Sequence, residues 1–437
     1  MSLAILWLVI PWAWSPVDDS GLVIQIGEKV DGLGRLSGTF SQLSALYQWD
    51  ENWGLFRPAY WVYQALFFQL PVSIAHLVRL FMVFAVVLGP VVYFRRSGAS
   101  SSRLWLTLLI ITAAASTLYQ GLFLVSLQEL SGAAFIGVGL MARRNSTRIA
   151  FWLVAALFKA PFAWILIGNS VFLWRQKKHL QAGISGGMGV VVLAASTVWS
   201  RNGDYTSRYR MNPLDLGIYE NFSRLVEPMN ALLLVGLLWW LIVTNSSVKR
   251  HEDALLFLVA WVGYTLTMIP WGVTAYYMGP ISYLFGIFLA SVLVNARNVS
   301  GRQVLVALLM PAFVAFWLTR ITLNLGFEIN SVMLQSKQCI APLSGSTTVI
   351  VGNLLYVTSS PEGAIRIMEQ VRMEDPNWSG SVTMENADRS GFLDPDTSHY
   401  LLIGAASVPE GRSVKKVCSG SAIALYELGP VNRPSTS

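Results

Sequence analysis

Charged residues are scarce in this sequence: Asp, Glu, Lys and Arg make up 13% of its 437 residues, roughly half the share that soluble domains carry. Apolar residues reach 54%, the mean hydropathy is +0.51, and several apolar runs approach the roughly 20 residues that a helix needs to cross a bilayer. This balance excludes an ordinary soluble enzyme. It predicts an all-α polytopic membrane protein.

Motifs for nucleotide and zinc chemistry are also lacking, because the chain contains no GxGxxG, P-loop, HExxH or CxxC pattern. We therefore expect no cofactor and no metal site, although the sequence leaves a divalent metal ion open. The net charge of +7 comes from short basic clusters between apolar runs. That distribution sets the orientation of a membrane protein and predicts no nucleic-acid partner.

The basic clusters predict which ends of the spans are cytoplasmic, since Lys and Arg gather on that side. They are Arg95–Arg96 with Arg103, Arg143–Arg144 with Arg148, Arg175 with Lys177–Lys178, Lys249–Arg250, and Arg297 with Arg302. The apolar runs between them predict about nine to eleven crossings. The odd number places the N-terminus in the cytoplasm and the C-terminus outside, in a multi-pass protein of the bacterial inner membrane.

Three segments are expected on the periplasmic side. The first is a long loop over residues 15–71, whose piece "PAYWVYQALFFQL" is predicted to lie in the membrane interface. The second is the loop over residues 200–228. The third is the tail, so that residues 1–325 form a transmembrane catalytic domain and residues 326–437 a separate periplasmic domain.

The tail has the pattern of a small α+β domain. "TTVIVGNLLYVT", "HYLLIGAAS" and "AIALYEL" resemble strands, and "PEGAIRIMEQVRM" resembles a helix. The only two cysteines of the chain, Cys339 and Cys418, both lie in this domain. Because the periplasm is oxidising, we expect them to form a disulfide; the alternative is two unrelated free thiols.

Carboxylates near the first spans are candidates for catalysis, because ionisable groups at membrane depth are expensive and usually functional. Those expected on the exterior side are Asp18, Asp19, Asp50, Glu51 and Glu129. Asp18 and Asp19 follow the first apolar run in "WSPVDDSGL". The alternative is that this pair only caps the segment that follows it.

Basic residues on the same side are candidate ligands for a phosphate group, and they are Arg57, Lys159, Arg208 and Arg210. Lys159, between "AALF" and "APFAWIL", must either snorkel to the interface or meet an anion. The arginines of the second loop have a simpler alternative, which is to balance the acids of that loop.

Carboxylates, cations and an apolar groove together suit transfer of a sugar from a polyprenyl phosphate. A carboxylate would take the proton of the acceptor hydroxyl. Arginine or lysine would stabilise the phosphate as it departs. The expected partners are therefore a polyprenyl-phosphate-linked sugar, a polysaccharide acceptor and membrane lipid.

The first 325 or so residues resemble the GT-C superfamily of integral-membrane glycosyltransferases. The resemblance rests on Asp18–Asp19 after the first span, "DENWGLFRPAYW" before an interfacial helix, Glu129 at a span opening, Lys159 in a middle pair, and "AYYMGP". The chain departs from the family where Lys159 is followed by "AP" rather than by Glu.

Within the superfamily the architecture is most like that of the type-specific O-antigen glucosyltransferases of serotype-converting bacteriophages. This resemblance implies undecaprenyl-phosphate glucose as donor, O-antigen lipopolysaccharide as acceptor, and Asp18 or Asp19 as the base. Asp50, Glu51 and Glu129 would orient the acceptor or hold the loop. The alternatives are an O-antigen polymerase or ligase, and a lipid or polysaccharide flippase.

Overall fold

The computed structural model describes residues 19–115, 118, 128–201, 203, 252–269, 275–295, 331, 334–352, 368, 371–372, 375–385, 399–403, 412–420 and 423–431. Predictions for residues 204–228, for the spans over 229–243 and 304–323, and for most of the helix over 361–373 lie outside this part. The described chain is mostly helical. It divides into two compact units, Thr39–Leu323, and Met1–Gly38 together with Asn324–Ser437.

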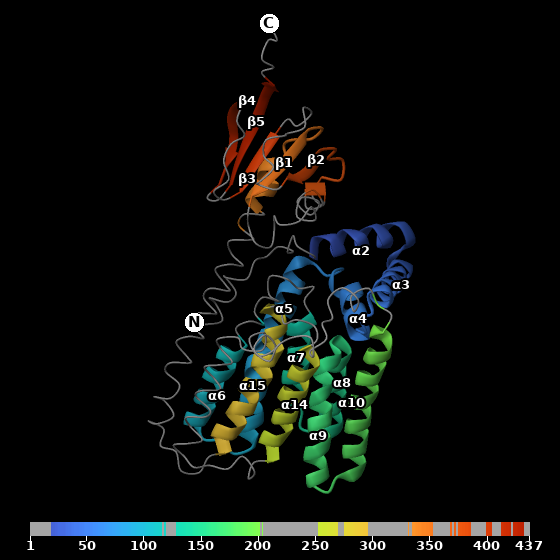
Figure 1. The fold of residues 1–437 in the computed structure, drawn as a ribbon, viewed down its shortest axis with the longest axis vertical. Coiled ribbons are helices and arrows are strands. Elements are labelled where there is room, and N and C mark those ends of the chain that lie inside the picture. Colours follow the sequence, from blue (N-terminus) through green and yellow to red (C-terminus); the bar gives the residue numbers. More distant parts are fainter. Residues whose placement is uncertain are drawn as a thin grey trace. The chain divides into compact units, whose positions relative to one another are not determined.

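The first unit is a helical bundle (Figure 1). Its described elements from Pro58 onward are α4 (Pro58–Phe67), α5 (Val72–Arg96), α6 (Ser101–Ala114), α7 (Gln128–Met141), α8 (Asn145–Phe158), η2 (Ala160–Ala163), α9 (Trp164–Arg175), α10 (His179–Ser200), α14 (Glu252–Met268) and α15 (Ala275–Asn295). α7 packs on both α5 and α8, α9 packs on α10 and α14, and α15 packs on α6 and α14.

Two of the described helices are long and apolar enough to cross a membrane, namely Leu77–Arg96 in α5 and His179–Ser200 in α10. Four shorter apolar helices, over 101–114, 145–158, 253–268 and 279–294, accompany them. α5 ends at Arg95 and Arg96, whose positive charges are favourable at the negative end of the helix dipole. These helices are consistent with association with a membrane.

The segment over residues 15–71, predicted as a long loop between two spans, is helical over most of its described length. α2 (Asp19–Leu33) and α3 (Arg35–Trp53) precede α4, and little more than Gly34 separates the first two. No proline occurs from Val17 to Arg57, so the backbone hydrogen bonds of a helix are not interrupted there. The segment "PAYWVYQALFFQL" does contain a helix, α4.

Close packing of α5 against α7 depends on two glycines. A Cβ atom added to Gly137 would lie 1.9 Å from the carbonyl oxygen of Ala85, and one added to Gly89 would lie 2.5 Å from the carbonyl oxygen of Gly137. The two backbones are therefore in direct contact. Small residues allow such contacts between helices in membranes, where packing rather than water exclusion drives association.

The second unit contains a five-stranded sheet in the order β2-β1-β3-β5-β4. Its strands are β1 (Thr347–Gly352), β2 (Ser381–Glu385), β3 (His399–Ile403), β4 (Arg412–Ser419) and β5 (Ile423–Val431). β1 is parallel to β2 and β3, whereas β5 is antiparallel to β3 and β4. The sequence analysis predicts β1, β3 and β5 but misses β2 and β4, which are the edge strands.

A disulfide joins Cys339, in a helical stretch before β1, to Cys418 in β4, the pair for which the sequence predicts one. The bridge spans a sequence separation of 79 residues, and its Cα atoms lie 5.7 Å apart. It ties the beginning of the domain to an edge strand near its end. In the same strand, the pairing with β5 shifts register between Arg412 and Val414 and again between Lys416 and Cys418.

We expect Gly137→Val to destabilise the bundle, because the new side chain would occupy the position of the Ala85 carbonyl. Forcing extra atoms into packed structure costs about 1–3 kcal/mol. Thermal unfolding of the full chain in detergent measures the loss. Gly183→Ala is the control, since nothing lies within 4 Å of a Cβ atom at that helical position. Equal unfolding temperatures for both variants would contradict the close contact of α5 with α7.

Replacing Cys418 by Ser should lower the stability of the C-terminal domain. In the chain-entropy model, opening a loop of this length costs about 4–5 kcal/mol. Limited proteolysis of the full chain, wild type and variant, with and without reductant, measures the loss. A wild-type chain that resists the protease equally with and without reductant would contradict a stabilising role for the bridge.

Candidate functional site

The segment between α3 and α4 holds a buried ion pair. Asp50, 1% exposed, lies in the last turn of α3, and Arg57 precedes the first residue of α4. The Nε atom of Arg57 donates to Oδ2 of Asp50 at 2.9 Å, and its Nη2 atom donates to Oδ1. This two-point contact matches the planar guanidinium to the carboxylate and fixes both side chains.

The backbone around Gly54 brings the end of α10 to this pair. Gly54 has a φ of +74°, which favours glycine and ends α3. A Cβ atom there would lie 2.9 Å from the Cα atom of Gly203, so the backbone segments around Gly54 and Gly203 are in contact. As a result, Trp199 of α10 donates from Nε1 to the carbonyl oxygen of Asp50 at 3.2 Å.

Aromatic side chains cover the Asp50 pair. Trp61 of α4 donates from Nε1 to Oδ2 of Asp50 at 2.5 Å. The rings of Tyr47 and Trp61 meet edge to face with centroids 5.4 Å apart, and Tyr47 contacts Trp199 in the same way at 5.5 Å. Tyr47 is 38% exposed, so this cluster also reaches the surface.

A second buried ion pair joins Glu129, in the first turn of α7, to Lys159 at the end of α8. The two residues are 3% and 7% exposed. Lys159 has extended backbone, with φ −154° and ψ 115°, between the end of α8 and the start of η2, where Pro161 lies in the first turn and has no backbone N–H to satisfy. The break at "KAP" thus points the lysine away from the course of α8 and toward the carboxylate.

Arg57 connects the two ion pairs. Its Nη1 atom donates to Oε1 of Gln128 at 2.9 Å, and Gln128 immediately precedes Glu129. The guanidinium of Arg57 also acts electrostatically on the Lys159 ammonium. Two carboxylates and two cations therefore form one cluster with no net charge, which is the arrangement that burial of several charges requires.

Two buried oxygens near the cluster have spare hydrogen-bonding capacity. Among the described residues, neither Oε2 of Glu129 nor the hydroxyl of Tyr264 has a hydrogen-bond partner. Tyr264 is fully buried in α14, interacts electrostatically with Glu129, and packs on Phe162 with ring centroids 5.1 Å apart. Buried polar atoms of this kind usually bind water or a ligand.

Four of the predicted site residues come together in this cluster: Asp50, Arg57, Glu129 and Lys159. Glu51 instead lies exposed on α3, where its Oε1 accepts a hydrogen bond from Tyr47 at 3.4 Å. Asp19 is the first residue of α2, in the other unit. Asp18, Arg208 and Arg210 lie outside the described residues.

The sequence analysis missed four residues of the site, namely Gln128, Trp61, Trp199 and Tyr264. Trp61 lies in the motif that carries the family resemblance, four residues after Arg57, and Gln128 is the neighbour of Glu129. Their closeness in sequence to Arg57 and Glu129 could have indicated that Trp61 and Gln128 belong to the site. Nothing in the sequence indicated Trp199 or Tyr264, which come from distant helices.

Charge and hydrogen bonding account for the chemistry that the described part of the site offers. Over the described ranges, no three of the residues His, Cys, Asp and Glu are grouped so as to hold a metal ion.

No protein-family model matches the chain, and a search of curated proteins finds no match.

The Glu129 and Lys159 side chains should contribute to stability as a coupled pair. Glu129→Ala or Lys159→Ala leaves one buried charge unpaired, which costs about 3–5 kcal/mol. The double variant should lose clearly less than the sum of the single losses, as measured by thermal unfolding in detergent. Glu51→Gln, at an exposed carboxylate, is the control. Additive losses would show that the two side chains do not form a coupled pair.

Proposed function

We propose that this chain is an integral-membrane glycosyltransferase of the GT-C kind. It would move a sugar, glucose in the resemblance described above, from undecaprenyl phosphate to a lipid-linked polysaccharide such as O-antigen. The reaction would take place at the periplasmic side of the bacterial inner membrane. The C-terminal domain would lie in the periplasm, where its disulfide is stable.

A membrane environment is supported by the surface of α10. This helix contains an 18-residue window with a mean hydropathy of 1.5, yet only 22% of that window is buried. Large apolar side chains that it exposes are Leu180, Ile184, Val190, Val191 and Val198. A helix in the core of a soluble protein buries such residues, whereas one that faces lipid does not.

The observation that carries the proposal is the buried cluster of Asp50, Arg57, Glu129 and Lys159. Its acids and cations come from segments that the GT-C resemblance singles out independently. Lys159 meets an anion, Glu129, rather than snorkelling to the interface.

In the proposed reaction, the acceptor hydroxyl oxygen attacks the anomeric carbon of the donor sugar. The bond from that carbon to the phosphate oxygen breaks, and the phosphate keeps the electron pair. The hydroxyl proton passes to a carboxylate, for which Asp18 and Asp19 are the first candidates. Cationic side chains offset the charge that develops on the phosphate.

Within this scheme, Arg57 and Lys159 are the described cations available to the phosphate, with Arg208 or Arg210 as further candidates. Asp50 and Glu129 hold Arg57 and Lys159 in place before the donor arrives. Glu129 keeps one oxygen without a hydrogen bond among the described residues, which allows it to orient an acceptor hydroxyl as well. The exposed face of Tyr47 gives a sugar ring an apolar surface near the cluster.

We expect Asp18→Asn or Asp19→Asn to reduce sugar transfer by about 10²–10⁴-fold, the usual effect of removing a general base. The measurement is glucose transfer from radiolabelled undecaprenyl-phosphate glucose to O-antigen lipid in membranes that contain the full chain, with protein levels matched by immunoblot. Asp31→Asn, an exposed position on α2, is the matched control.

Full activity in both variants would remove the aspartate pair from catalysis and make Glu129 and Glu51 the next candidates. No transfer by the wild-type chain, in membranes supplied with donor and acceptor, would contradict the glycosyltransferase proposal itself.

A further inference from the structure

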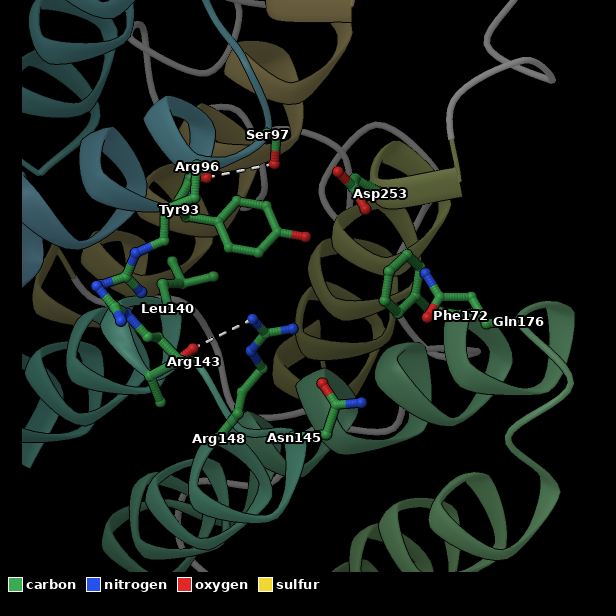
Figure 2. Close-up of a pocket in the computed structure, with 11 residues that line it drawn as sticks. Tyr93, Arg96, Ser97, Leu140, Arg143, Asn145, Arg148, Phe172, Gln176 and Asp253 are labelled. Atoms are coloured by element: carbon green, nitrogen blue, oxygen red, sulfur yellow. Dashed lines mark hydrogen bonds between the residues drawn. The ribbon is translucent and has the colours of Figure 1, made fainter.

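A cavity of about 610 Å³ lies at the other end of the α7–α8 pair from the charge cluster. It is lined by the ends of α5, α7 and α9 and by the beginnings of α8 and α14, including Tyr93, Arg96, Arg143, Arg148 and Asp253 (Figure 2). α7 has 14 residues, which correspond to a length of about 20 Å. The cavity is therefore a site distinct from the one described above.

Three arginines line this cavity, and one carboxylate accompanies them. In the described part of the chain, none of Arg96, Arg143 and Arg148 forms an ion pair. The carboxylate, Asp253, interacts instead with the hydroxyl of Tyr93, which points toward it in Figure 2. The lining thus keeps an excess of positive charge.

Arg148 is held in position for a ligand. Its guanidinium carbon lies 5.3 Å from the centre of the Tyr93 ring and 5.7 Å from that of Trp152, contacts that orient the side chain without neutralising it. Nη2 donates to the carbonyl oxygen of Ala142 at 3.4 Å. The buried Nε atom, among the described residues, donates to nothing.

The start of α8 adds to the positive potential. Asn145, its first residue, lines the cavity, and the preceding residue makes no side-chain capping bond to the helix. The first amide groups of a helix point outward and carry a partial positive charge, which favours anions. A fixed guanidinium, two further arginines and a helix start therefore converge on one cavity.

We propose that this arginine pocket binds a phosphate group. Arginine matches the geometry of phosphate oxygens with paired hydrogen bonds, and the volume admits a headgroup larger than the bare ion. The phosphate belongs either to an anionic phospholipid of the membrane leaflet at that end of the bundle or to a soluble phosphate compound. This proposal does not depend on the glycosyltransferase proposal.

The test measures binding to the purified, delipidated full chain in detergent by native mass spectrometry, with dioleoyl phosphatidylglycerol, dioleoyl phosphatidylcholine and inorganic phosphate as probes. We expect phosphatidylglycerol to bind more tightly than phosphatidylcholine. Arg143→Gln should weaken it about tenfold, since a hydrogen bond to a charged group is lost. Arg144→Gln is the matched control, because this exposed neighbour does not line the cavity.

Arg148→Gln should weaken binding at least as much, and the exposed Arg143 keeps the test valid if that variant does not fold. Inorganic phosphate binding with the same dependence on Arg143, and no preference for phosphatidylglycerol, would support the pocket with a soluble ligand. Equal weakening by Arg143→Gln and Arg144→Gln, or no binding of any probe, would overturn the proposal.

Discussion

Mutual neutralisation of buried charges is the constraint on which the arrangement of the helical unit depends. Glu129, Lys159 and Asp50 are almost completely buried, and each would be costly there alone. Their pairing fixes the start of α7 against the end of α8, and Arg57 fixes the start of α4 against both through Gln128. The start of α7, the end of α8 and the start of α4 therefore lie together, because the buried charges that they carry require partners.

Around this point, tight backbone contacts do the remaining positioning. Gly54 and Gly203 let the end of α10 reach α3, and so bring Trp199 to the carbonyl oxygen of Asp50. At the helix centres, Gly89 and Gly137 hold α5 against α7. Polar contacts therefore position the helix ends, and small residues set the close spacing of the helices along their length.

The sequence predicted helices where apolar runs are bounded by basic residues or proline, and α5, α6, α7, α8 and α9 follow those boundaries within a few residues, whereas α10 begins eleven residues before the predicted start at Val190. It failed for α2 and α3, because their mixture of polar and apolar residues gives no clear period. It predicted Asp50, Arg57, Glu129 and Lys159 as candidate site residues, because ionisable groups at membrane depth are usually functional, and the structure brings these four side chains together. It gave no sign that Lys159 would pair with Glu129 or that Tyr264 would lie beside them, since such contacts depend on how distant helices pack.

The edge strand β4 affects whether copies of the protein can aggregate by pairing their sheets. β4 borders the sheet, and an edge strand offers unpaired backbone groups to any other strand that approaches. Here Lys415 and Lys416 are exposed, and the pairing of β4 with β5 is irregular before and after these two lysines. A second copy would have to strip water from both ammonium groups and straighten the strand. Pairing of two copies through this edge of the sheet is therefore disfavoured.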